Sequence, residues 1–139
     1  MRFLTIVTAA LLVACTGESR PPLVADDIVV SRAMPGMTMS AAYLSLQNNS
    51  AEAITITRVS SNEYDSVEMH QSSIEDGVAR MRKLPELTIP AGSAVALQRG
   101  GRHLMLMHPT GPAESVTLDF YSDDTLLLSV VAKVAPESD

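Results

Sequence analysis

The sequence predicts a small all-β protein with a single domain and a sandwich or barrel architecture. Short runs of aliphatic and β-branched residues recur along the chain, and several alternate apolar and polar positions as half-buried strands do. Clusters of Gly, Pro, Asn and Asp separate these runs at close intervals, which is typical of sandwiches and barrels. No window of helical length carries an apolar stripe with a 3.6-residue period, so we expect little helix.

The expected strands follow one another along the whole chain. The runs at 42–46 and 54–57 alternate clearly, and the two runs nearest the C-terminus are the strongest. In chain order, the predicted strands are residues 28–30, 42–46, 54–57, 67–70, 78–84, 94–97, 103–107, 116–120 and 126–134. The turn residues between them include 35–36, 48–50, 90–92, 100–101, 109–112 and 123–124.

The composition supports a folded core and limits what builds it. The 139 residues are enough for one domain, so neither a metal nor a disulfide is required merely for folding. Aromatic residues make up 4% of the chain and tryptophan is absent, so Val, Leu, Ile, Ala and Met must fill the core. The net charge of -6 lacks the basic footprint of a nucleic-acid binder, and we expect no nucleic-acid partner.

The N-terminus reads as a targeting segment. Residues 1–14 have a positive start at Arg2 and an apolar stretch too short to cross a bilayer, which predicts a secretory signal peptide. The segment ends in Leu-Val-Ala before Cys15 and resembles the bacterial lipobox, in which the cysteine is lipidated. The alternative is an ordinary signal peptide followed by a chance cysteine. Thr16, rather than Asp, follows the cysteine, which resembles the outer-membrane sorting pattern of lipoproteins in Gram-negative bacteria.

These features divide the chain into four segments. Residues 1–14 are the expected lipoprotein signal peptide, and 15–26 are the lipidated Cys15 with a polar, Pro-containing tether. The β domain is expected over 27–135, followed by a short tail at 136–139. The predicted location is the bacterial cell envelope, on the periplasmic side, anchored to a membrane through Cys15. Because Cys15 is the only cysteine, the domain itself has no disulfide, zinc ribbon or catalytic thiol.

The segment from His103 to Met107 carries the first candidate ligands. In a strand, alternate side chains share a face, so His103, Met105 and Met107 point one way while Leu104 and Leu106 point toward the core. A His and a Met two positions apart on one face can bind a metal together. The same segment can also be a strand whose Met residues pack under a loop and whose His is solvated, and alone it favours that second interpretation.

Two further residues extend the pattern. His70 and Met81, taken with His103 and Met105, give the spacing His-x10-Met-x21-His-x-Met. This spacing resembles the signature of the PCuAC-type periplasmic copper chaperones, and the resemblance covers most of residues 28–133. The flanking segments are also similar, at 41–44, 48–49, 67–70, 75–78, 80–82, 100–101 and 104–107. The resemblance implies that His70, Met81, His103 and Met105 are the metal ligands.

The chemistry of these four side chains is consistent with the resemblance. Two thioethers and two imidazoles form a soft, neutral donor set that suits Cu(I), whereas zinc prefers thiolate, imidazole or carboxylate and calcium needs oxygen clusters. An electron-transfer copper centre would use a Cys thiolate, which the domain lacks. We therefore expect Cu(I) as the bound ion, held by ligands that allow transfer to a stronger acceptor.

The resemblance also implies a fold and a role. It implies a cupredoxin-like β-sandwich or barrel with the ligands near one end. It further implies a non-enzymatic chaperone that delivers copper to a copper-accepting protein, either the copper domain of cytochrome c oxidase or a thiol-bearing assembly factor. The alternatives are a copper-buffering or structural lipoprotein without a delivery role, and an enzyme on the same scaffold. A hydrolase is disfavoured because the chain has no G-x-S-x-G motif.

Several other residues near the pattern allow two interpretations. Met69 and Met107 are candidates for positions beside the metal, although alternation places Met69 on the face opposite His70, which favours the core. Three methionines precede the second strand and form either an auxiliary Cu(I) site or entry path, or a loop with partly buried side chains: Met34, Met37 and Met39. Three cations flank Met81 and either dock an acidic partner or form a solvated strand face: Arg80, Arg82 and Lys83. His108 lies outside the pattern and is expected at the surface.

Overall fold

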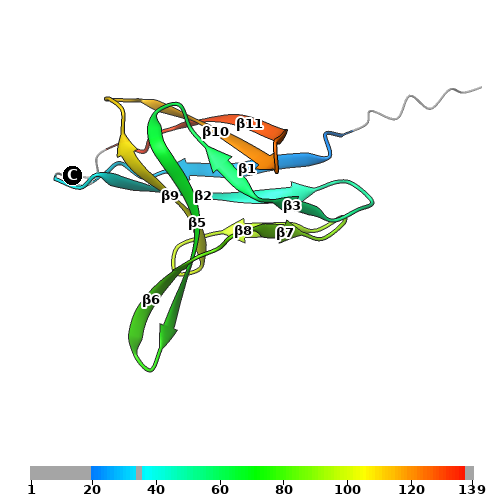
Figure 1. Ribbon diagram of the computed structural model, residues 1–139, viewed down its shortest axis with the longest axis horizontal. Coiled ribbons are helices and arrows are strands. Elements are labelled where there is room, and N and C mark those ends of the chain that lie inside the picture. Colours follow the sequence, from blue (N-terminus) through cyan, green and yellow to red (C-terminus); the bar gives the residue numbers. More distant parts are fainter. Residues whose placement is uncertain (1–19, 34–35, 137–139) are drawn as a thin grey trace, which may run out of the picture.

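The computed structural model describes residues 20–33 and 36–136, and within them every regular element is a strand (Figure 1). This confirms the prediction of an all-β fold. The strands are β1 (Leu23–Val30), β2 (Met39–Asn48), β3 (Ile54–Ile56), β4 (Arg58–Ser60), β5 (Tyr64–Glu75), β6 (Val78–Lys83), β7 (Leu87–Ile89), β8 (Ala94–Leu97), β9 (Arg102–Pro109), β10 (Ser115–Ser122) and β11 (Thr125–Lys133). The expected signal peptide, Cys15, Met34 and residues 137–139 lie outside the described residues.

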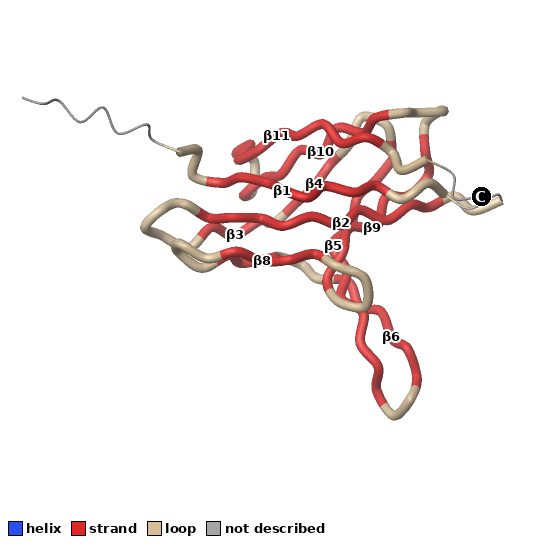
Figure 2. The backbone as a smooth tube through the Cα atoms, turned by 180° about the vertical axis from the view of Figure 1, so that it is seen from behind, coloured by secondary structure: helices blue, strands red, loops and turns tan. Residues whose placement is uncertain are grey.

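One curved sheet forms most of the molecule. Its strand order is β1-β2-β9-β5-β4-β10-β11, with β8 also paired to β2 and β6 paired to β5, while β3 and β7 form a separate pair. A parallel bridge between Val30 and Val134 joins the two ends of this order, so the sheet is nearly closed into a barrel. Figures 1 and 2 accordingly show β1, β10 and β11 together along one side of the molecule. No helix long and apolar enough to cross a membrane occurs in residues 20–33 and 36–136.

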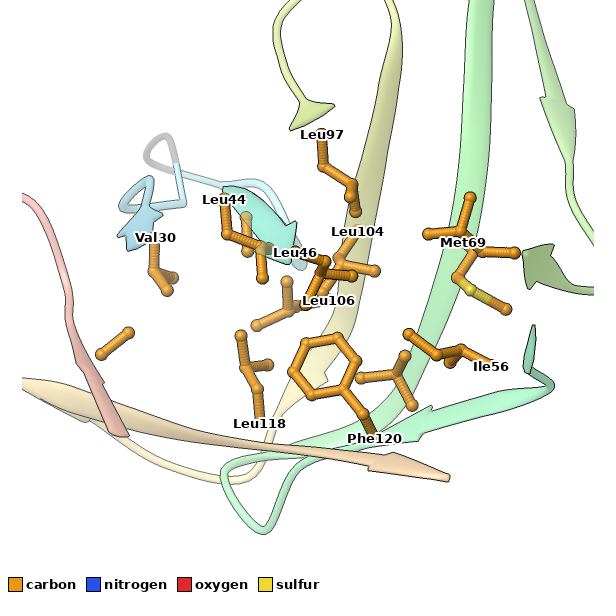
Figure 3. Close-up of a cluster of buried hydrophobic side chains, with 14 of the residues drawn as sticks. Val30, Leu44, Leu46, Ile56, Met69, Leu97, Leu104, Leu106, Leu118 and Phe120 are labelled. Carbon is orange, nitrogen blue, oxygen red and sulfur yellow. The ribbon is translucent and has the colours of Figure 1, made fainter. Parts of the chain in front are cut away.

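The core lies between the inward-facing residues of the strands. Alternate positions of β2, β9 and β10 are fully or almost fully buried, and their side chains meet in the centre (Figure 3). Burying one such aliphatic or aromatic side chain stabilises the fold by about 1.5–3 kcal/mol. The inward residues of these three strands include Leu44, Leu46, Leu104, Leu106, Leu118 and Phe120. The prediction that Leu104 and Leu106 face the core is confirmed.

The structure corrects where the folded part begins. The polar, Pro-containing surroundings of residues 23–26 predict a tether, but these residues form the first half of β1 and pair with β2 from Leu23 opposite Asn48. Leu23 is only 1% exposed, so its burial fixes the start of the strand. The sequence pattern does not predict two short strands, β4 and β7.

The hairpin of β5 and β6 extends beyond the barrel. Both views show its outer part projecting away from the rest of the molecule (Figures 1 and 2). We call residues 72–82 the arm. Asp76 and Gly77 close it with φ angles of 52° and 77°, as in the two-residue turns that match the twist of paired strands. All six residues of β6 are exposed, so the arm is held by cross-strand pairing rather than by the core.

Candidate metal centre

The two candidate histidines are direct neighbours across two strands. β5 and β9 run antiparallel, and their register places His70 opposite His103. Residues opposite one another in such a pair project from the same face of the sheet. The centroids of the two imidazole rings are 5.9 Å apart, and the ring planes are tilted by 60°. The sheet thus unites two histidines that are far apart in the chain.

Met105 occupies the next position on the same face. It follows His103 by two residues in β9 and lies opposite Glu68 of β5. The intervening Leu104 is fully buried on the other face, and Met105 itself is partly buried. The alternation predicted for this strand is therefore present.

Met81 lies on the same face but further out. In the hairpin register it is opposite Ser72, which shares a face with His70 because the two are two residues apart. Met81 is thus diagonal to His70 on the neighbouring strand, and its side chain is 51% exposed. The structure brings the two histidines together beside Met105 and leaves Met81 open to solvent at the base of the arm.

A carboxylate determines which nitrogen of His70 is free. Oε2 of Glu68 is 2.9 Å from Nε2 of His70, and Oε1 of Glu68 is 2.6 Å from Nζ of Lys83. The hydrogen bonds from Lys83 and from His70 lower the pKa of Glu68, so its carboxylate is ionised and can only accept. Nε2 of His70 is therefore the donor. In the neutral imidazole this leaves the lone pair on Nδ1, which is buried and has no hydrogen-bond partner among the described residues.

His103 presents its other nitrogen. Its Nδ1 is 3.2 Å from the carbonyl oxygen of Gly101, which can only accept, so Nδ1 carries the proton and Nε2 keeps the lone pair. The ring of Tyr43 packs at 6.4 Å from the imidazole, and the guanidinium of Arg99 lies 5.0 Å from the Tyr43 ring. Metal-binding histidines commonly donate their second N–H to a carboxylate or a backbone carbonyl, and both arrangements occur here.

The surrounding donors favour a soft metal. Across residues 20–33 and 36–136, no group of three or more His, Cys, Asp or Glu side chains is placed to hold a metal ion. Two imidazoles alone leave the coordination of a metal incomplete. The other donors on this face are the thioethers and the carboxylate of Glu68, whose two oxygens already bond to His70 and Lys83. Neutral thioether and imidazole donors fit Cu(I) and fit poorly with zinc or hard cations.

The other residues singled out in the sequence lie in different surroundings in the structure. Met69 is buried in the core (Figure 3), so it does not lie beside the candidate ligands, whereas Met107 projects from their face and His108 is exposed.

The three cations near Met81 form ion pairs within the β5–β6 hairpin. Arg80 and Arg82 contact Glu75 at 3.2 Å and 3.1 Å, and Lys83 contacts Glu68.

Sequence reasoning did not assign roles to Glu68 or Tyr43. A usable pattern was present for Glu68, because it precedes His70 by two residues and so shares its face. Tyr43 could not be found this way, since it comes from β2 and reaches His103 only through the strand order of the sheet.

The fold defines the class of this protein. The nearly closed, all-strand sheet is that of a PCuAC-type domain, which has a cupredoxin-like architecture. The chain belongs to the LpqE-like family, a PCuAC-type family, and matches it over residues 23–134.

Individual relatives agree with this assignment. A protein of Leifsonia xyli subsp. xyli that carries a lipoprotein name, Lxx21020, is 30% identical over 142 residues, which cover 90% of this chain and 86% of the relative. The Cu(I) form of DR1885 from Deinococcus radiodurans is similar with a TM-score of 0.66 and 30% identity, over 86% of this chain and 82% of that chain. The copper-bound PCuAC domain from PmoF2 has a TM-score of 0.63 and 18% identity, over 85% and 94%, and shares the fold.

Proposed function

We propose that this protein is a Cu(I)-binding chaperone in which Nδ1 of His70, Nε2 of His103 and the sulfur atoms of Met81 and Met105 hold the ion. The observation that carries the proposal is the buried Nδ1 of His70, which has no hydrogen-bond partner in the part of the chain that the structure describes and lies beside the imidazole of His103. A buried nitrogen without a hydrogen bond is costly unless a ligand satisfies it. The 30% identity to DR1885, which has a Cu(I) form, supports copper as that ligand.

The donor set suits a carrier better than an enzyme. All four donors are neutral, so a recipient with thiolate ligands can take Cu(I) from them by ligand exchange. Met81 is half-exposed on the arm and is the donor that an incoming group can replace first. The role requires no bond-making chemistry, and we infer that the protein is not an enzyme.

The recipient we propose is the copper site of cytochrome c oxidase or a thiol-bearing assembly factor. Such a recipient lies outside the cytoplasm, which agrees with the expected signal peptide and with lipidation at Cys15. The lipoprotein name of the Leifsonia relative supports anchoring to a membrane of the cell envelope. We place the domain on the periplasmic side, with the outer membrane favoured by Thr16.

A competition experiment tests the copper site. The purified protein is titrated under anaerobic conditions with Cu(I) in the presence of a colorimetric chelator. We expect one tightly held equivalent, weakened at least tenfold in His70→Ala and His103→Ala. His108→Asn is the matched control, because His108 is exposed and has a φ of 55°, which asparagine tolerates. A wild type that cannot compete, or variants that bind as well as wild type, would contradict the proposal.

A second experiment separates delivery from buffering. The Cu(I)-loaded protein is mixed with the copper-free oxidase domain, and copper is measured on each after separation. Transfer that is faster than spontaneous dissociation into the chelator supports a chaperone. Copper that leaves no faster than into the chelator supports the alternative, an envelope lipoprotein that buffers copper without delivering it.

A further inference from the structure

Two methionines before and at the start of β2 are open to solvent. Met37 is 53% exposed and Met39 is 40% exposed. Met39 does not contribute to the core, because β2 alternates and its inward positions are Ser40 and Ala42, both buried. Met37 precedes the strand, and its exposure keeps it out of the core as well. Their thioethers are therefore free of the packing role that usually explains a methionine.

Met39 is a close neighbour of Met107. The register of β2 and β9 places these two residues opposite one another. The N–H of His108 donates to the carbonyl of Thr38 at 2.7 Å, so Thr38 and His108 form a hydrogen-bonded pair of the ladder. Hydrogen-bonded and non-hydrogen-bonded pairs alternate in an antiparallel sheet, so the next pair, Met39 and Met107, is non-hydrogen-bonded. In an antiparallel sheet the side chains of such a pair are the closest across the strands.

Met37 and Met39 share a shallow pocket with one of the candidate ligands, Met105. It has a volume of about 180 Å³, and Met37, Met39 and Met105 line it. The remaining lining residues are Ser31, Arg32, Ser40 and Ala41. Met105 therefore borders this pocket while also lying next to His103 on β9, and Met107 lies two residues further along the same face.

We propose that Met37, Met39 and Met107 form a second, weaker Cu(I) site that exchanges the ion with the His/Met centre through Met105. This proposal rests on the proposed copper-carrying function and extends it. Three thioethers are neutral and soft, which selects Cu(I) over zinc and over hard cations. The positive charge of Arg32 at the pocket opposes any cation, so binding here is weaker than at the two imidazoles.

Movement between the two sites requires no redox step. The sulfur of Met105 binds the ion as a thioether of the second site releases it, and copper stays Cu(I) throughout. Met37 and Met39 are more exposed than the buried imidazole of His103, so an arriving ion can reach these two thioethers directly from solvent.

Stoichiometry tests the second site. The purified protein is titrated anaerobically with Cu(I) against two chelators of different strength, and the same is done for the Met37→Leu/Met39→Leu double variant. We expect two equivalents in wild type, the second held at least tenfold more weakly, and one equivalent in the double variant with its affinity unchanged. Met69→Leu is the control, because it makes the same exchange in the core, and it keeps both equivalents.

NMR of the methionine ε-methyl groups provides an independent readout. The Met39 and Met107 methyl signals are expected to shift during the second equivalent, and the Met69 signal is expected to stay. Wild type with only one equivalent, or a double variant that still binds two, overturns the second site while the proposed function stands. Wild type that binds no Cu(I) overturns both.

Discussion

Oε2 of Glu68 lies 2.9 Å from Nε2 of His70, two positions along the same strand, and the other oxygen of Glu68 lies 2.6 Å from Nζ of Lys83. This chain of contacts holds the imidazole of His70 in one orientation and one tautomer. It joins three residues of β5 and β6, so the base of the arm and the candidate metal centre are mechanically connected. The structure thus gives Glu68 a positioning role that acts through His70.

Replacing Glu68 by alanine is expected to weaken Cu(I) binding by about 10- to 100-fold, the usual effect of losing a partner of a metal-binding histidine. The thermal stability of the metal-free protein should change little, because the ion pair of Glu68 with Lys83 is largely open to solvent and such pairs contribute little to folding. Chelator competition and thermal denaturation measure the two effects. Glu75→Ala is the matched control, since Glu75 pairs with Arg80 and Arg82 on the same hairpin without contacting His70. Equal affinities in the two variants would argue against the positioning role.

Met81→Leu is expected to separate copper binding from folding. The side chain is half-exposed, so leucine should change the free energy of unfolding by no more than about 0.5 kcal/mol. Leucine has nearly the same volume but no sulfur lone pair, so Cu(I) affinity should fall more than tenfold. Urea denaturation without metal and chelator competition test the two statements. Val78→Leu, on the same exposed strand, should leave both quantities unchanged, and an unchanged affinity in Met81→Leu would remove Met81 from the ligand set.

Asn48 is expected to be critical for stability although it lies far from the site. It is completely buried, its Nδ2 donates to the carbonyls of Glu52 and Ile89 at 2.7 Å and 3.0 Å, and its Oδ1 accepts from the N–H of Ser50. Asn48→Ala leaves buried backbone groups without partners and should cost about 1–3 kcal/mol. The test is urea denaturation, with Asn49→Ala as the exposed control. A loss no larger than that of the control would show that water replaces these bonds.

Glu63 is expected to make stability depend on acid pH. Burial alone raises the pKa of Glu63. Hydrogen bonds from the N–H of Thr117 and the hydroxyl of Ser61 lower it by more than burial raises it, so the net pKa is below the ordinary value of 4.5. The folded state therefore favours the ionised carboxylate. This stabilisation is complete above pH 4.5 and is lost as the pH falls through the lower folded pKa.

Glu63→Gln provides the test of that pH dependence. The variant should melt at a lower temperature than wild type at neutral pH, and the difference should shrink as the pH is lowered through the carboxylate range. Melting curves at a series of pH values measure it. A difference in melting temperature that stays constant with pH would mean that the charge of Glu63 does not contribute to stability.

The sequence alone determined that the fold is built of strands and which side chains of the central strands point toward the core. The alternation of Leu104 and Leu106 with His103 and Met105 is a local property, because side chains in a strand change face at every residue. Local patterns also located most of the strands. They missed the short strands β4 and β7, and they missed the start of β1 at Leu23, whose burial depends on its pairing with β2.

The spacing of the four His and Met residues, through its resemblance to a family, also selected candidates that the fold places on one face of the sheet. Their role as copper ligands stays a prediction. Only the tertiary structure decided that His70 faces His103 and that Met39 faces Met107. It also decided that Glu68 accepts a hydrogen bond from Nε2 of His70, which leaves Nδ1 with the lone pair. These relationships depend on the register between strands distant in the chain. That register is set by the burial of a whole face at once, so no local pattern specifies it.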